Sequence, residues 1–206
     1  FMRNVRNSGV IPQISVICGP CAGGAVYSPA LTDFVFMVEG SSYMFLTGPK
    51  VVKTVTFEDV TVEELGGGRT HATQTGVTQF LYPTDIDALN GVRHLLSYLP
   101  DNWRERPRFE ETSDPVDRLC PEIAEIFPES PRIPYDVRGI VDTIIDANSF
   151  LEVHMHWAKN IVVGFARLAG RSVGLVANQP AELAGCLDID ASRKGARFIR
   201  TCNAFN

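Results

Sequence analysis

One short stretch, Gln13–Asp33, constrains the fold of this chain more than any other. It opens with the apolar run Ile14–Ile17, whose residues are typical of a buried strand. The dipeptide Gly19-Pro20 ends that strand, and Ala22–Ala25 then carries almost no side-chain bulk, so a ligand can approach the main chain closely. The small and apolar residues of Ala25–Leu31 favour the start of a helix.

This succession of strand, glycine turn and helix is the candidate active-site element. A tight turn that leads into a helix points free backbone N–H groups at one spot, which suits an anion or a developing oxyanion. The glycines form neither the G-x-x-x-x-G-K-[ST] loop nor the G-x-G-x-x-G fingerprint of phosphate-binding sites. The remaining alternative is a turn that is rich in glycine only because it packs tightly.

Two further interpretations of the same stretch are weaker. Residues Val10–Thr32 carry no charge and are long enough for a transmembrane helix, but three prolines and the pair Gly23-Gly24 would interrupt that helix repeatedly. Cys18 and Cys21 have the C-x-x-C spacing of a dithiol redox site. A redox site requires a helix that begins at the first cysteine and lowers its pKa, but here a pair of glycines follows. Nothing else in the chain resembles a thioredoxin.

The rest of the chain alternates short apolar runs with helical patterns, which favours an α/β fold built in layers. Extended segments are expected at Phe34–Val38, Tyr43–Leu46 and Phe150–Val153, and a hairpin is expected from Ile161–Leu168 and Ser172–Ala177. Helices are expected at Phe1–Gly9, Gly48–Glu58, Val60–Leu65, Asp85–Leu99, Val137–Ile145 and Asp190–Cys202. Thr61 and Glu64 have the spacing of a capping box.

The spacing of apolar residues assigns a core face to two of these helices. In Asp85–Leu99 the core face is Ile86, Leu89, Val92, Leu96 and Leu99. In Asp190–Cys202 it is Ala196, Phe198, Ile199 and Cys202. The second helix also carries a positive side of Arg193, Lys194, Arg197 and Arg200, which is typical of a solvated face or else attracts an anionic ligand or partner.

A second glycine-rich turn is expected at Gly66–Gly68, shortly before His71. His71 is the best placed of the four histidines, but no carboxylate partner for acid–base catalysis stands out, so we expect it to satisfy local hydrogen bonds or to lie in solvent. His154 and His156 are spaced like a metal pair, yet no third ligand has suitable spacing, and no metal site is expected.

Residues 101–135 differ in composition from the rest and are expected to connect two domains. This segment is rich in charges and contains Pro107, Pro115, Pro121, Pro128, Pro131 and Pro134. The apolar residues expected to dock it onto a neighbour are Leu119, Ile123, Ile126 and Phe127.

Charge and cysteine content exclude several classes of protein. The net charge is −5, and no basic stripe indicates a nucleic acid or a membrane surface as partner. Five scattered cysteines do not make a disulfide framework, and without a signal peptide we expect them to be reduced, in an intracellular compartment. Phe1 in place of an initiating Met, and an end directly after a helix, indicate an internal fragment of a longer polypeptide.

Several long motifs carry a resemblance to a known family. The motifs are Val10–Ser15, Gly19–Asp33, Thr47–Pro49, Glu64–Gly67, Ser172–Pro180 and Gly185–Ile189. Together they strongly resemble the carboxyltransferase (beta) subunit of propionyl-CoA carboxylase and related biotin-dependent acyl-CoA carboxylases, and they extend over nearly the whole chain. Gly19–Asp33 and Gly185–Ile189 look like the propionyl branch rather than the methylcrotonyl branch. Cys18 departs from the pattern, since an aliphatic residue is expected there.

The resemblance implies a crotonase (ClpP-like) spiral fold that occurs twice in the whole protein. Residues 1–100 would be the C-terminal part of an N-terminal carboxyltransferase domain, residues 101–135 the connector, and residues 136–206 the start of a homologous C-terminal domain. It also implies biotin carried on a biotin carboxylase/biotin carrier (alpha) partner, an acyl-CoA substrate, and self-association of beta subunits. The compartment would be the mitochondrial matrix in a eukaryote or the cytoplasm in a bacterium.

The resemblance implies a role for the glycine turn. The acyl-CoA thioester loses an α-proton, and the backbone amides of Gly23 and Gly24 hold the enolate oxygen, while Ala22 and Ala25 shape the turn. Cys21, Gly67 and His71 would line the substrate site, and the biotin-side oxyanion hole would lie outside this chain.

Other functions remain open at this point. One alternative is another biotin-dependent carboxyltransferase, acting on acetyl-CoA or methylcrotonyl-CoA or as a transcarboxylase. A crotonase-type hydratase or hydrolase would need an acidic residue near the turn, and none stands out. A non-catalytic scaffold subunit of the same fold would bind no CoA thioester.

Overall fold

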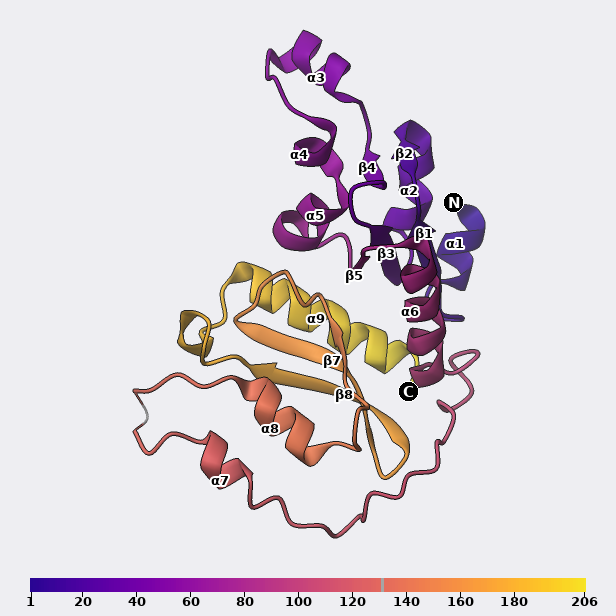
Figure 1. Ribbon diagram of the computed structural model, residues 1–206. Helices are drawn as coiled ribbons and strands as arrows, with labels where there is room; N and C mark the ends of the chain where they lie inside the picture. Colours follow the sequence, from indigo (N-terminus) through magenta and orange to yellow (C-terminus); the bar gives the residue numbers. More distant parts are fainter. Residues whose placement is uncertain (131) are drawn as a thin grey trace. The chain divides into compact units, whose positions relative to one another are not determined.

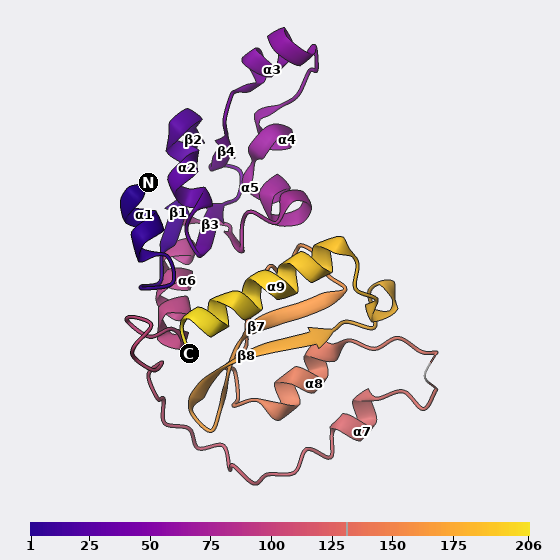
Figure 2. The same ribbon diagram turned by 180° about the vertical axis from the view of Figure 1, so that it is seen from behind.

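The computed structural model describes residues 1–130 and 132–206, so Pro131 of the expected connector lies outside the described residues. The chain divides into two compact units, Phe1–Leu96 and Ser97–Asn206 (Figures 1 and 2). The assignment of residues 1–100, 101–135 and 136–206 to two carboxyltransferase domains and a connector stays a prediction.

The first unit is built on a three-stranded parallel sheet in the order β1-β3-β5, with β1 at Ile14–Ile17, β3 at Phe34–Val38 and β5 at Phe80–Tyr82. The expected strands at β1 and β3 are confirmed, whereas β5 was not expected. Every residue of β3 is at most 3% exposed, which fits the continuous apolar run of a parallel strand covered on both faces. The ring of Phe36 stacks on that of Phe80, with centroids 4.5 Å apart.

A second, two-stranded parallel sheet joins β2 at Pro20–Ala22 to β4 at Tyr43–Phe45. The sequence predicted the second of these strands but assigned the first to the turn. Pro20 is tolerated because it is the first residue of a strand, where its missing N–H removes no essential ladder bond. The core below the turn consists of Ile17, Val26, Val35, Met37 and Met44.

The helices of the first unit are mostly short. Their bounds are α1 Met2–Asn7, η1 Gly23–Val26, α2 Tyr27–Ala30, α3 Pro49–Thr56, α4 Val62–Gly66, α5 Gly68–Thr70, η2 His71–Thr75 and α6 Asp85–Tyr98. The helix expected at Gly48–Glu58 is confirmed as α3, and the capping box of Thr61 and Glu64 is confirmed at α4. The turn expected at Gly66–Gly68 is wrong, because these residues end one helix and begin the next.

The core face predicted for Asp85–Leu99 is mostly wrong, and of its residues only Leu99 is fully buried. Ile86 is 71% exposed and Leu89 is 54% exposed, whereas Ala88 and Leu95 are fully buried. The helix approaches β5 through its small residues: a Cβ placed on Gly91 would lie 2.4 Å from the hydroxyl of Tyr82. Close packing through Ala88 and Gly91 therefore determines which side of α6 is buried. Leu95 lies on that side, whereas Ile86, Leu89 and Leu96 are exposed.

The second unit contains a three-stranded antiparallel sheet in the order β6-β7-β8, with β6 at Leu151–Val153, β7 at Ile161–Leu168 and β8 at Arg171–Asn178. The expected hairpin is confirmed. Its two-residue turn places Ala169 and Gly170 at φ values of 50° and 73°, the left-handed conformations that a type I′ turn requires.

Two helices cover opposite faces of this sheet (Figures 1 and 2). Helix α8, Val137–Ile144, packs through Val141 on Ala166, while α9, Ile189–Ala204, packs through Phe198 on the neighbouring Phe165. Successive residues of a strand point to opposite faces, so these contacts define a layered α/β unit. The N-cap of α9 is Asp188, whose carboxylate accepts the amide of Ala191 at 2.8 Å.

The expected packing of α9 and of the connector is only partly right. Phe198 is buried, but Ile199 is 55% exposed and Ala196 is also exposed. Within the connector, α7 at Ile123–Ile126 packs against α8, whereas Leu119 is 87% exposed and does not dock. The remaining short helix, η3, spans Leu183–Gly185.

Candidate functional site

The predicted glycine turn lies where β2 ends and η1 begins, at Gly23. Gly23 has a φ of 64°, a left-handed conformation that only glycine adopts without strain. Gly24 is exposed, and a Cβ placed on it would meet no atom within 4 Å. In a helix that begins at Gly23, the amides of Gly23 and Gly24 precede the first intrahelical hydrogen bond, so the turn can present donors to a ligand.

Strand β4 holds the predicted site residues together. Its residue Phe45 pairs with Ala22 of β2, directly before the glycine turn. On its other edge, Tyr43 forms an isolated bridge with Gly67, and the carbonyl of Met44 lies 2.7 Å from Nε2 of His71. The structure therefore brings the two predicted groups, Cys21–Ala25 and Gly67 with His71, to opposite edges of one strand.

Close packing against the backbone requires glycine at position 66. A Cβ on Gly66 would lie 2.1 Å from the carbonyl oxygen of Met44, and a Cβ on Gly67 would lie 1.9 Å from the carboxylate of Glu63. That carboxylate also accepts the amide of Arg69 at 3.2 Å. The role of Gly67 in lining a substrate site stays a prediction, and the atoms that a Cβ would meet there belong to the end of the exposed Glu63 side chain.

Both ring nitrogens of His71 have partners inside the chain. Since the carbonyl of Met44 only accepts, Nε2 carries the proton, and Nδ1 lies 2.9 Å from the hydroxyl of Thr75. The ring thus ties η2 to β4. This arrangement gives His71 a positioning role next to the glycine turn, and its predicted contact with substrate stays a prediction.

Replacing His71 by alanine is expected to lower the free energy of unfolding by about 1–2 kcal/mol, because the carbonyl of Met44 loses its donor. Urea denaturation of the variant measures this change. Gln74→Ala, at an exposed position in the same helix, is the matched control and should stay within about 0.5 kcal/mol of the parent. Equal stability of the two variants would contradict the positioning role.

The two cysteines of the C-x-x-C pattern lack the character of a redox pair. Burial raises the pKa of the Cys21 thiol, and burial together with the Asp85 carboxylate raises that of Cys18. A redox dithiol instead requires a depressed pKa, since the thiolate is the reactive form. Cys18 also precedes a strand rather than a helix. The structure therefore argues against the dithiol interpretation.

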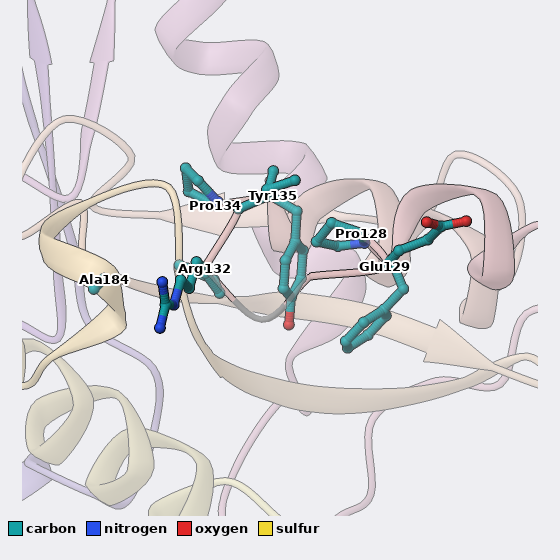
Figure 3. A pocket seen from close by; sticks show the side chains of 9 residues that line it. Pro128, Glu129, Arg132, Pro134, Tyr135 and Ala184 are labelled. Atoms are coloured by element: carbon teal, nitrogen blue, oxygen red, sulfur yellow. The ribbon is translucent and has the colours of Figure 1, made fainter.

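One described cavity, of about 440 Å³, lies in the second unit and is lined mainly by prolines and aromatic rings (Figure 3). Pro128, Pro134 and Tyr135 form one part of its wall, and Ala184 lies across from them. Its charged residues are Glu129 and Arg132. No residue of the predicted glycine site belongs to it.

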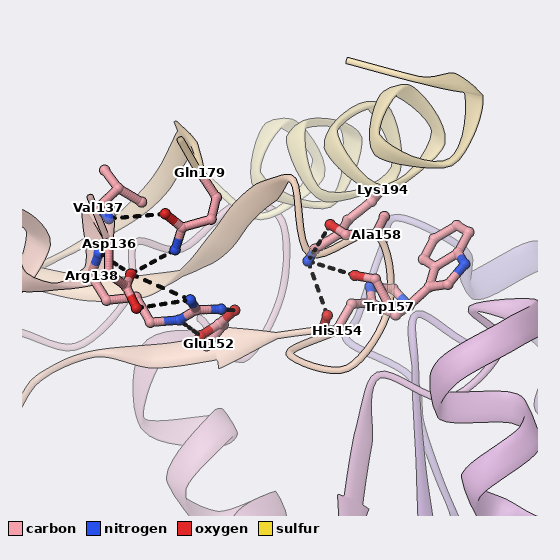
Figure 4. Close-up of polar contacts among 9 residues, drawn as sticks. All are labelled: Asp136, Val137, Arg138, Glu152, His154, Trp157, Ala158, Gln179 and Lys194. Carbon is pink, nitrogen blue, oxygen red and sulfur yellow. Dashed lines mark hydrogen bonds and ion pairs between the residues drawn. The ribbon is translucent and has the colours of Figure 1, made fainter. Parts of the chain in front are cut away.

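Lys194 corrects the prediction of a solvated positive face on α9. Its side chain is fully buried, and Nζ donates to the carbonyls of His154 and Trp157, each at 2.9 Å, and of Ala158 at 3.3 Å (Figure 4). Burial lowers the pKa of Lys194 to about 8. The sequence pattern could not identify this residue, because the carbonyls belong to a loop far away in the chain.

A buried ion pair accompanies Lys194 in the second unit. Glu152 accepts two hydrogen bonds of 2.7 Å from Arg138, and Asp136 accepts one of 2.6 Å from Gln179 (Figure 4). The amide oxygen of Gln179 in turn accepts the amide of Val137. These bonds fasten the start of α8 to the sheet.

The structure was also searched for groups that could bind a metal ion and for helices that could cross a membrane. Within residues 1–130 and 132–206, no three His, Cys, Asp or Glu side chains come together in a group that could hold a metal ion. His154 is buried against Trp157 and supplies its carbonyl to Lys194. Among the same residues, no helix has both the length and the apolar character needed to cross a membrane.

Comparisons with known proteins point to one family, and each match covers the full chain. The family model of the carboxyl transferase domain matches residues 1–206. A propionyl-CoA carboxylase carboxyltransferase subunit from Haloferax mediterranei is 58% identical over 206 residues, all of this chain and 40% of the relative. The mitochondrial propionyl-CoA carboxylase beta chain from Homo sapiens is 55% identical over 206 residues, all of this chain and 38% of the relative.

Among solved structures, the transcarboxylase 12S core with methylmalonyl-coenzyme A and methylmalonic acid bound matches with a TM-score of 0.96. It is 47% identical, and the match covers all of this chain and 39% of that one. This chain thus spans about 40% of the length of its relatives.

Proposed function

Because the chain belongs to the carboxyl transferase domain family, we propose that the whole protein is the carboxyltransferase component of a biotin-dependent propionyl-CoA carboxylase. It transfers the carboxyl group from carboxybiotin to the α-carbon of propionyl-CoA, which gives methylmalonyl-CoA. The observation that supports this most is the 58% identity, over all 206 residues, to a propionyl-CoA carboxylase carboxyltransferase subunit. The fold is the crotonase-like fold of the transcarboxylase and acyl-CoA carboxylase structures.

In this proposal the amides of Gly23 and Gly24 hold the thioester oxygen as it becomes an enolate oxygen. Fixed donors that are aimed at a developing charge stabilise the transition state without reorganisation. Ala22 and Ala25 keep the surface of the turn low, and both are exposed beside Gly24. Cys21 lies in the same short strand, and Gly67 and His71 support it from the other edge of β4.

The residues at the turn fit a reaction in which the base that removes the α-proton is not a side chain of the turn. From Pro20 to Ala30 the side chains include no acid, histidine or lysine, and the ring nitrogens of His71 are occupied. Biotin, carried by a partner subunit or domain, supplies the carboxyl group and, once decarboxylated, the proton acceptor. The turn itself contributes main-chain donors and open space at Gly24.

The proposal includes partners and a compartment. The chain acts with a biotin carboxylase/biotin carrier (alpha) subunit, binds acyl-CoA, and self-associates as a beta subunit. Relatives include a mitochondrial beta chain from a mammal and an archaeal subunit, so we place the protein in the mitochondrial matrix of a eukaryote or in the cytoplasm of a prokaryote.

Carboxylation by the intact complex tests this function. We expect ATP- and bicarbonate-dependent incorporation of labelled carboxylate into propionyl-CoA, blocked by avidin, with a higher kcat/KM than for acetyl-CoA or methylcrotonyl-CoA. Absence of any avidin-sensitive carboxylation of these substrates would contradict the proposal.

A related transfer reaction is the second candidate, since the transcarboxylase core matches with a TM-score of 0.96. In that case the protein removes the carboxyl group from methylmalonyl-CoA and passes it through biotin to another acceptor. Two results together would favour this candidate. Labelled carboxylate would pass from methylmalonyl-CoA to the biotin carrier without ATP, and propionyl-CoA would not be carboxylated when ATP is present.

A further inference from the structure

A second cavity, of about 1000 Å³, lies in the second unit, and none of its lining residues belongs to the glycine site. It is formed by the segment that follows α6, by the first two residues of β8 and by Asn206. The residues that matter are Trp103, Arg104, Arg106, Phe109, Arg171 and Ser172. Its size is within the range of small-molecule sites.

The walls of this cavity are fastened to one another. The amide of Glu110 donates to the carbonyl of Gly170 at 3.0 Å, and a Cβ on Gly170 would lie 2.1 Å from the carbonyl oxygen of Glu110. Glu110 also pairs with the buried Arg167 of β7 at 2.7 Å. The segment with Trp103 and Phe109 is therefore bonded to the β7–β8 hairpin at Glu110.

The cavity carries positive charge that no Asp or Glu side chain among the described residues neutralises. No carboxylate lines it, and Arg104, Arg106 and Arg171 form no ion pair with any residue of 1–130 or 132–206. The acidic side chains nearby have other partners. Asp101 pairs with Arg108 at 3.6 Å, Glu105 accepts from Asn102 at 2.6 Å, and Glu110 is held by Arg167.

Aromatic rings accompany these arginines. Trp103 is 47% exposed and Phe109 is 63% exposed, and the guanidinium of Arg104 lies 5.1 Å from the centre of the Trp103 ring. Exposed aromatic faces stack on planar heterocycles, and guanidinium groups bind phosphate through paired hydrogen bonds. The hydroxyl of Ser172 on the same wall is buried and has no partner among the described residues, which leaves one more donor.

We propose that this cavity is a nucleotide-binding site, separate from the glycine turn and independent of the proposed function. The base stacks on Trp103, and the phosphates bind Arg104, Arg106 and Arg171. A cavity of about 1000 Å³ has room for a nucleoside diphosphate.

The test is calorimetric titration of ADP into the full-length carboxyltransferase chain, without the biotin carboxylase partner and with propionyl-CoA at saturation. The propionyl-CoA keeps ADP out of any acyl-CoA site. We expect one ADP site of micromolar affinity that weakens with salt, and adenosine should bind at least about tenfold more weakly because it lacks phosphate.

Variants locate the site. Arg104→Ala combined with Arg171→Ala should weaken ADP binding at least about tenfold, since two phosphate contacts are lost. Trp103→Ala should weaken ADP and adenosine by the same factor, because it removes stacking. Arg200→Ala, at an exposed position on α9, is the matched control and should leave the affinity unchanged. No binding of ADP, or binding that the arginine pair does not affect, would overturn the proposal whether or not the protein carboxylates propionyl-CoA.

Discussion

Replacing Gly24 by proline is expected to lower kcat for propionyl-CoA carboxylation by about 100- to 1,000-fold, the usual cost of losing one oxyanion donor. Proline has no N–H, so this substitution removes the proposed donor itself. The backbone should tolerate it, because Gly24 has no positive φ and lies in the first turn of a helix, where proline is favoured. Steady-state kinetics of the full-length complex provide the measurement.

A matched variant separates the donor from side-chain bulk. Gly24→Ala keeps the amide, and its Cβ meets no protein atom within 4 Å, so it should fold and lose less than about tenfold in kcat. Gly24→Val keeps the amide but places a branched side chain where the thioester would lie, and carboxylation should be abolished. Equal kcat values for the proline and alanine variants would contradict the donor role.

Replacing Lys194 by methionine is expected to lower the free energy of unfolding by about 3–5 kcal/mol. Methionine fills a similar volume but leaves three loop carbonyls, those of His154, Trp157 and Ala158, without their donor. Arg193→Ala, at the exposed neighbouring position, should change stability by no more than about 0.5 kcal/mol. Urea denaturation measures both, and a near-neutral methionine variant would show that the carbonyls find other partners.

The cost of this substitution should grow with pH. The pKa of Lys194 is lowered from 10.5 to about 8 in the folded protein, so between these values the unfolded chain binds more protons than the folded one. The stability of the parent therefore rises with pH through this window relative to the methionine variant. We expect the difference in unfolding free energy to increase by about 2 kcal/mol from pH 7 to pH 10. A constant difference would mean that Lys194 titrates normally.

The elements that a local pattern determines were predictable. The apolar runs of β1 and β3, the capping box at Thr61 and the hairpin at Ala169-Gly170 each depend on neighbouring residues, and all three are present. Helix α6 shows the limit of such patterns. Its large apolar residues suggested the core face, but close packing of Gly91 against the ring of Tyr82 buries the side with Ala88, Gly91 and Leu95 instead.

The sequence was sufficient to predict the residues of the candidate site, but not the strand that holds them together. The glycine turn follows from the run of small residues between a strand and a helix. The role of β4 could not be predicted in this way, because its pairing with β2 and its hydrogen bond to His71 join residues more than twenty positions apart. Lys194 was misplaced for the same reason, since no helical periodicity reveals three carbonyls of a loop that precedes it by more than thirty residues.

The most direct test is a crystal structure of the full-length protein with propionyl-CoA bound. The account predicts the thioester oxygen about 2.7–3.1 Å from the amide nitrogen of Gly24, with Gly23 beside it. A thioester oxygen lying on other donors, with the Gly24 amide bonded to a carbonyl of the protein, would contradict it.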